Sequence, residues 1–202
     1  MQLVLATNNE DKIKEIKHFL DDLPITILTR NDFLEFPDVE ETGSTLEKNA
    51  ILKAQEIARF CGLPALADDS GLEVDFLKGT PGVFSSRYAG EKVTYADNNR
   101  KLLEALKGVP QEKRTARFRC VIAICWETDK KIDTVEGIVE GYITEDIMSN
   151  NGFGYDPVFY YPPKNKRFSE MSLKEKNLIS HRGQALNKAR ALIIEKINKK
   201  GN

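Results

Sequence analysis

Two pairs of adjacent carboxylates, Glu40-Glu41 and Asp68-Asp69, have the chemistry of a magnesium site. Each pair lies near glycine or serine in a segment without helical periodicity, and Mg²⁺ in proteins usually takes one or two carboxylates together with phosphate oxygens and waters. Solvated acidic surface is the alternative, and it is a serious one for Glu40-Glu41. For Asp68-Asp69 we favour a function, because an apolar run leads directly into two charges that need partners in a folded chain.

A polar segment near the N-terminus has the pattern of an anion site. It joins a predicted strand to a predicted helix, where backbone N–H groups and the helix dipole attract negative charge. The segment consists of Thr7, Asn8, Asn9, Glu10, Asp11 and Lys12. The side chain of Lys12 could supply the counter-charge. Capping of the helix by Asn8 or Asn9 explains the same residues and would be preferred if the segment stood alone; the glycines of a Walker loop are missing.

Residues 152–157 combine two glycines, two aromatic residues, a carboxylate and a proline. Their order is Gly152, Phe153, Gly154, Tyr155, Asp156 and Pro157. Glycine allows close backbone approach, aromatic rings can stack on a nucleobase, and proline stiffens the exit of the loop. These properties suit a planar heterocycle, although an ordinary turn before a strand explains this loop equally well when it is taken alone.

Lys176, His181 and Arg182 place three cationic or titratable groups between two predicted helical segments. Such groups could hold a phosphate or donate to a base carbonyl, and arginine is well suited to planar acceptors. Positive charge that stabilises a helix C-terminus is the alternative.

Hydrophobic periodicity predicts the helices that must position these groups. Two of them cover residues 11–20 and 97–106. Two more begin at capping-box spacings, Ser44 with Glu47 and Ser172 with Glu175. The apolar stripe of the last helix consists of Leu186, Ala189, Ile193 and Ile197.

Apolar and β-branched runs predict strands at residues 3–6, 25–28, 65–67, 72–74, 116–126 and 134–143. Asp68-Asp69 is therefore expected at a strand end or in a tight turn. Helices mixed with strands and long glycine-bearing loops indicate a mixed α/β fold.

The composition is that of an ordinary globular protein of 202 residues, with 41% hydrophobic residues. A net charge of −1 gives no overall attraction to nucleic acid or to a membrane surface, and no run reaches the roughly 20 apolar residues that span a bilayer. Three cysteines without metal-type spacing favour reduced thiols. We therefore expect a cytoplasmic protein, without a leader peptide, that binds neither nucleic acid nor membrane.

Ordered motifs over nearly the whole chain resemble the inosine triphosphate pyrophosphatase family. They are residues 5–9 with Lys12, 41–43, 49–50, 67–72, 79–82, 87–90, 152–157 and 180–183. The resemblance implies an α/β, two-lobed mixed fold with a central elongated sheet and a nucleotide-binding cleft between the lobes, in which residues 1–202 form a single pyrophosphatase domain. It also implies a homodimer and Mg²⁺-dependent hydrolysis of ITP, dITP and XTP to nucleoside monophosphate and pyrophosphate.

Position by position, the resemblance implies that residues 7–12 hold the phosphates, that Asp69 is general base and metal ligand, and that Ser70 contacts substrate. Either Glu40 or Glu41 would be the second metal ligand. The two are adjacent, so the resemblance does not say which of them it is. The nucleotide site would be lined by Phe153, Gly154, Tyr155, Asp156, Lys176, His181 and Arg182.

The hypothesis for the reaction is in-line attack of water on the α-phosphorus, with Asp69 as the base. Donors from Arg182 or backbone N–H groups would favour a 6-keto purine over adenine. A pyrophosphatase for other modified nucleotides and a non-catalytic nucleotide sensor are the alternatives. The acidic pair Asp68-Asp69 counts against the sensor, which needs no carboxylate to activate water.

Overall fold

A computed structural model describes residues 1–127, 131–148 and 152–200. The chain divides into two compact units, each assembled from separate stretches of sequence. Unit 1 contains Met1–Asp69, Cys120–Gly137 and Arg182–Asn202, and unit 2 contains Ser70–Arg119 and Ile138–His181. Each unit is described below by itself.

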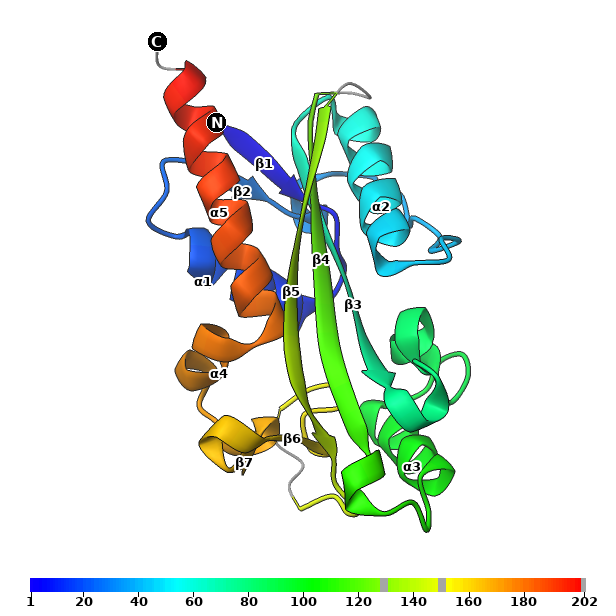
Figure 1. Cartoon of the computed structure of the whole chain (residues 1–202). Helices are drawn as coiled ribbons and strands as arrows, with labels where there is room; N and C mark the ends of the chain where they lie inside the picture. Colours follow the sequence, from blue (N-terminus) through cyan, green and yellow to red (C-terminus); the bar gives the residue numbers. More distant parts are fainter. Residues whose placement is uncertain (128–130, 149–151, 201–202) are drawn as a thin grey trace. The chain divides into compact units, whose positions relative to one another are not determined.

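The strands form one sheet with the order β2-β1-β3-β4-β5-β6-β7 (Figure 1). β1 pairs in parallel with β2 and β3, whereas β6 pairs antiparallel with β5 and β7. The predicted mixed α/β class is thus confirmed. The strands are β1 (Gln2–Leu5), β2 (Thr26–Leu28), β3 (Ala65–Val74), β4 (Thr115–Glu127), β5 (Lys131–Ile143), β6 (Phe159–Tyr161) and β7 (Lys166–Arg167).

Three helices belong to unit 1: α1 (Glu10–Leu20), α2 (Leu46–Cys61) and α5 (His181–Lys200), which is drawn in red in Figure 1. The apolar stripes of α1 and α5 pack on the strands in one core. α2 also buries an apolar stripe, which includes Ala50, Ala54 and Ile57. In α5 the predicted stripe is confirmed, since Leu186, Ala189 and Ile193 are buried and Ile197 packs against them. α2 begins later than predicted, because Thr45 rather than Ser44 accepts the hydrogen bond that caps it.

Unit 2 contains α3 (Tyr95–Ala105) and α4 (Leu173–Ile179). Its separate core includes Leu72 on β3, Leu102 on α3 and Phe159 on β6. The predicted capping box of Ser172 with Glu175 is confirmed at the start of α4. Within the residues that the structure covers, no helix is both long and apolar enough to cross a membrane.

The expected position of Asp68-Asp69 at a strand end or in a turn is wrong. Residues 65–67 and 72–74 belong to one continuous strand, β3, and both carboxylates lie inside it and are buried. The sequence pattern suggested a break because carboxylates are rare in buried strands. The strand tolerates them because cationic side chains from other elements compensate both charges.

Candidate active site

The polar segment at residues 7–12 caps α1 and also supplies a cation. The side chain of Asn9 accepts hydrogen bonds from the backbone N–H groups of Asp11 (3.0 Å) and Lys12 (3.2 Å), so Asn9 is a capping residue. Thr7 accepts from the N–H of Asn9, while exposed Asn8 donates to Asp38. Capping fixes the first turn of the helix and leaves the ammonium group of Lys12 directed at the sheet.

Asp68 lies at the centre of a buried ionic cluster. Its Oδ2 atom is 2.9 Å from Nζ of Lys12 and 3.4 Å from Nε of Arg182. Burial alone would raise the pKa of Asp68, but Lys12 and Arg182 hold that pKa well below its ordinary value. Asp68 is therefore an anion at neutral pH and compensates the charges of Lys12 and Arg182.

Arg182 was expected as a donor to the substrate or as a charge at a helix C-terminus. The second interpretation is wrong, because Arg182 lies in the first turn of α5. A cation is unfavourable at that end of a helix. Two carboxylates compensate it here, since its Nη1 atom is 2.6 Å from Oε2 of Glu15 on α1 and its Nε atom faces Asp68.

Asp69 lies next to a second lysine that the sequence analysis did not assign. Nζ of Lys53 is 3.5 Å from Oδ1 of Asp69, 2.7 Å from Oε1 of Glu41, and 2.7 Å from the backbone carbonyl oxygen of Asp68. Asn49, one turn earlier on α2, donates to Oδ2 of Asp69 at 3.1 Å. Asn49 and Lys53 fall within the buried stripe of α2. Polar residues at positions of such a stripe are the sequence signal that could have identified them.

Burial makes Asp69 more basic than an exposed aspartate. Burial raises the pKa of Asp69, and the nearby Glu41 carboxylate raises it further, although Lys53 acts in the opposite direction. Burial alone would lower the pKa of Lys53, but its carboxylate neighbours outweigh that effect. Lys53 therefore remains charged, and Asp69 is a stronger base than an exposed aspartate.

The acidic side chains of this cluster suit a hard divalent cation. Glu41 and Asp69 share one ammonium group, whereas Glu40 is exposed. In the part of the chain that the structure describes, no three His, Cys, Asp or Glu side chains are grouped closely enough to hold a metal by themselves. Two carboxylates nevertheless fit Mg²⁺, because this ion keeps several waters and binds substrate phosphates.

In unit 2, the 152–157 loop is organised around one buried ion pair. Oδ2 of Asp156 accepts from Nζ of Lys176 at 2.6 Å and from the backbone N–H of Phe153 at 3.1 Å. Nζ of Lys176 also lies 4.0 Å from the centre of the Phe153 ring. Phe153 is half-buried, whereas Asp156 and Lys176 are buried, so Phe153 is the most exposed of the three.

The remaining predicted residues of unit 2 have different surroundings. Tyr155 is buried, its hydroxyl donates to the carbonyl oxygen of Ser85, and burial raises its pKa. Tyr155 therefore anchors the loop to the segment that contains Ser85. His181 is buried with its ring stacked on Phe118, 4.7 Å between centroids. Ser70 is half-buried in β3.

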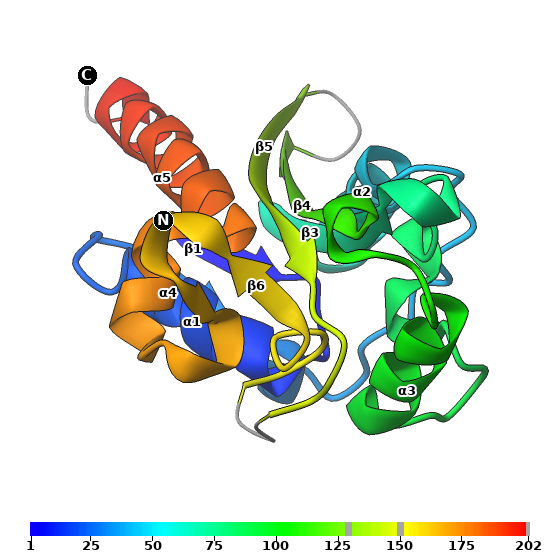
Figure 2. The same ribbon diagram turned by 60° about the horizontal axis from the view of Figure 1, so that its bottom comes forward.

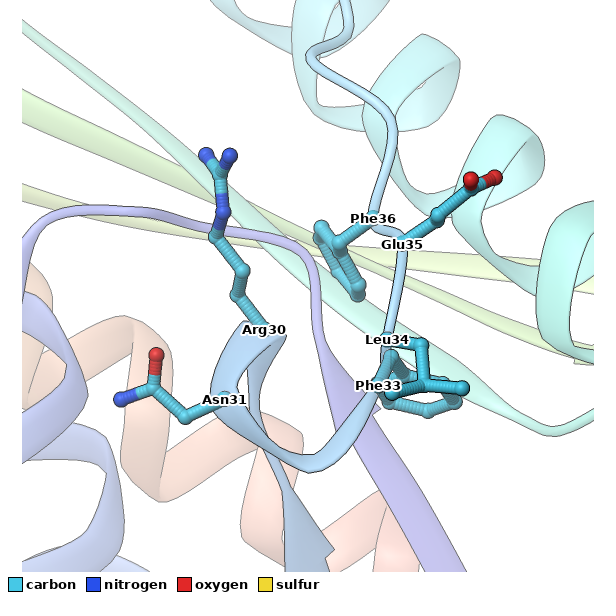
Figure 3. A pocket seen from close by; sticks show the side chains of 6 residues that line it. All are labelled: Arg30, Asn31, Phe33, Leu34, Glu35 and Phe36. Atoms are coloured by element: carbon cyan, nitrogen blue, oxygen red, sulfur yellow. The ribbon is translucent and has the colours of Figure 1, made fainter.

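A surface pocket of about 530 Å³ lies elsewhere in unit 1 (Figure 3). None of the predicted site residues lines it. Its walls are the side chains of Arg30, Asn31, Phe33, Leu34, Glu35 and Phe36.

The fold and the ionic cluster of unit 1 define a mixed α/β protein whose buried carboxylates and lysines suit an anionic, metal-associated substrate. The model of the Ham1 family matches residues 3–192. The chain therefore belongs to the Ham1 family.

Individual relatives agree with this assignment and confirm the resemblance found from the motifs. A dITP/XTP pyrophosphatase of Desulforamulus reducens is 52% identical over 193 residues, 96% of each chain. A dITP/XTP pyrophosphatase of Geobacter sulfurreducens is 50% identical over 92% of each chain. A HAM1 protein from Coxiella burnetii has a solved structure with a TM-score of 0.90 and 45% identity, covering 96% of this chain and 99% of the other.

Proposed function

We propose that this chain is a nucleoside triphosphate pyrophosphatase that converts dITP, ITP and XTP to the nucleoside monophosphate and pyrophosphate. The names of relatives that match it over nearly their whole length support this substrate class. The observation in the site that carries the proposal is the buried carboxylate of Asp69, whose pKa is raised by burial and by Glu41 against the opposing effect of Lys53. Such a group is a base poised to act on water.

Asp69 accepts a proton from the attacking water while the water oxygen bonds to the α-phosphorus. The bond from the α-phosphorus to the bridging oxygen then breaks, and pyrophosphate leaves with the electron pair. A raised pKa brings the base closer to neutral pH, where general base catalysis is most efficient. Lys53 orients Asp69 and Glu41, and Lys12 contributes positive charge for the phosphates.

Mg²⁺ is the proposed cofactor, and Asp69 with Glu41 would hold it. Glu40 is the less suitable of the two adjacent glutamates because its side chain is exposed. When bound, the ion neutralises charge on the triphosphate. Asn49 and Lys53 keep both carboxylate groups oriented.

The 152–157 loop is proposed to recognise the purine. The half-buried ring of Phe153 is suited to stacking on a base, and the pair of Asp156 with Lys176 fixes that ring. Selection of a 6-keto base requires a donor to its oxygen. Arg182 is one predicted donor to that oxygen. Its guanidinium group also contacts the carboxylates of Glu15 and Asp68.

Two further expectations stay predictions: a homodimer and a cytoplasmic location. Sedimentation of the purified chain across a concentration series tests the first. Fractionation of cells that express the chain tests the second.

The proposal is tested by incubating the protein with ITP, XTP, dITP, GTP and ATP, with Mg²⁺ and with a chelator, and by identifying the products. We expect metal-dependent release of pyrophosphate and monophosphate from ITP, XTP and dITP, with little from ATP. Binding without turnover of all five nucleotides would indicate a sensor instead. If a modified pyrimidine nucleoside triphosphate is added to the same assay and is hydrolysed faster than these purines, the proposed substrate class would be wrong.

A further inference from the structure

The 152–157 loop depends on contacts from outside for its conformation. Gly152 and Gly154 both have positive φ, +80° and +61°, and they flank Phe153. Glycine restricts the backbone less than any other residue. The direction of the Phe153 ring must therefore be set by groups that hold the loop on either side.

Helix α3, drawn in green in Figure 2, carries one of these groups. Nδ2 of Asn99 donates a hydrogen bond of 2.9 Å to the backbone carbonyl oxygen of Gly154, 55 residues away in sequence. Tyr95, one turn earlier on α3, has its ring 6.4 Å from the ring of Phe153. Two residues on one face of α3 thus meet two consecutive residues of the loop.

Stability is a poor explanation for an asparagine at position 99. The residue is 2% exposed, and its Oδ1 atom has no hydrogen-bond partner among the described residues. The side-chain NH₂ group of Asn99 donates to the Gly154 carbonyl oxygen. The Oδ1 atom of Asn99 therefore points away from that carbonyl. Leaving a buried acceptor unpaired costs at least as much as one neutral hydrogen bond contributes, so Asn99 adds little or nothing to folding stability.

We propose that Asn99 is a positioning residue for purine binding. Its hydrogen bond fixes the Gly154 peptide, and through it the ring of Phe153 that stacks on the base. Asn99 itself does not touch the substrate. This inference rests on the proposed function of the loop and adds a positioning residue on α3.

Asn98 is a matched control on the same helix. It is also 2% exposed, but its amide group holds a different segment, accepting from the N–H of Ala89 at 2.7 Å and donating to the carbonyl oxygen of Ser86 at 3.0 Å. Leucine has nearly the shape of asparagine and lacks polar atoms, so Asn→Leu removes hydrogen bonds without opening a large cavity.

The test compares Asn99→Leu with Asn98→Leu. For Asn99→Leu we expect a melting temperature close to that of the wild type, because an unpaired acceptor is removed with the donor. We also expect kcat/KM for ITP to fall about fivefold to tenfold, mainly through a higher KM. For Asn98→Leu we expect the reverse: a lower melting temperature and an unchanged KM for ITP. If Asn98→Leu does not fold, Asn98→Asp, which keeps the acceptor for Ala89, replaces it.

Product binding separates positioning from general damage. The dissociation constant of inosine monophosphate should rise in Asn99→Leu by a factor similar to that for KM, whereas that of pyrophosphate, which has no base, should not change. An unchanged KM for ITP, or equal weakening of both products, would overturn the role of Asn99. A wild-type protein that fails to hydrolyse ITP would instead contradict the proposed function.

Discussion

Asp68 and Asp69 are neighbours in β3, yet their carboxylates have opposite electrostatic environments. Successive side chains of a strand point to opposite faces. Asp68 meets Lys12 and Arg182, which lower its pKa, whereas burial next to Glu41 raises the pKa of Asp69. Titratable neighbours with divergent pKa values have different tasks. Asp68 compensates two cations, and Asp69 is the proposed base.

Asp69→Asn should abolish most turnover while the fold persists. Asparagine keeps an acceptor for the Asn49 amide but cannot accept a proton from water. We expect kcat for ITP to fall by about 10²- to 10⁴-fold, with circular dichroism and melting temperature near those of the wild type. Pyrophosphate release measures the loss. An unaltered rate would remove Asp69 from the mechanism.

Glu41→Gln and Glu40→Gln form a matched pair that identifies the metal ligand. Glu41 contacts Lys53 at 2.7 Å, whereas Glu40 is exposed. We expect Glu41→Gln to raise the Mg²⁺ concentration at half-maximal rate by about tenfold or more, comparable to losing one ligand interaction of 1.4 kcal/mol. Glu40→Gln should leave it unchanged. The opposite result would identify Glu40 as the metal ligand.

Lys53→Met should shift the acid limb of the pH profile upward. Lys53 opposes the burial that raises the pKa of Asp69, so its removal raises that pKa further. The rate of the variant should therefore begin to fall at a higher pH than that of the wild type, in profiles of kcat/KM against pH. Lys48→Met is the control, because Lys48 is an exposed residue of the same helix. Coincident acid limbs would contradict the prediction.

Asp68→Asn should destabilise the fold in a pH-dependent way. Removing one partner of a buried ion pair costs about 3–5 kcal/mol. The folded pKa of Asp68 lies below the unfolded value of about 3.9. The stabilisation is therefore complete above about pH 5 and is lost as the pH falls through 4 toward the folded pKa.

Urea unfolding of wild type and Asp68→Asn at pH 7, 6, 5 and 4 measures this difference. It should be constant from pH 7 to 5 and shrink at pH 4. Asp38→Asn serves as a control, since Asp38 pairs with Arg30 at the surface and should contribute about 1 kcal/mol or less. A difference that grows on acidification would refute the lowered pKa of Asp68.

Gly152→Ala should perturb the 152–157 loop more than Gly154→Ala. Both glycines have positive φ, so alanine costs about 1–2 kcal/mol at either position. A Cβ atom at residue 152 would also lie 2.7 Å from Oδ2 of Asp156, while at residue 154 it meets nothing within 4 Å. The affinity for inosine monophosphate should weaken more in Gly152→Ala, as calorimetry would measure. Equal effects would show that the contact with Asp156 is unimportant.

Local sequence patterns were sufficient to predict many of the helices and strands, because capping and hydrophobic periodicity act over a few residues. The cap of Ser172 on α4 and the stripe of Leu186 and Ala189 on α5 are examples. Asp68-Asp69 was the main exception. A local pattern cannot show that cations on other elements will compensate two carboxylates inside a strand.

The sequence by itself determined the family, through ordered motifs, and the residue types available for the chemistry. Only the tertiary structure decided how they are combined: Lys53 with Glu41 rather than Glu40, Arg182 with Asp68 across 114 residues, and Asn99 with Gly154. The reason is physical. Burial and electrostatic energies depend on which groups meet in space, and these pairs are brought together by helices packing on the sheet rather than by spacing along the chain.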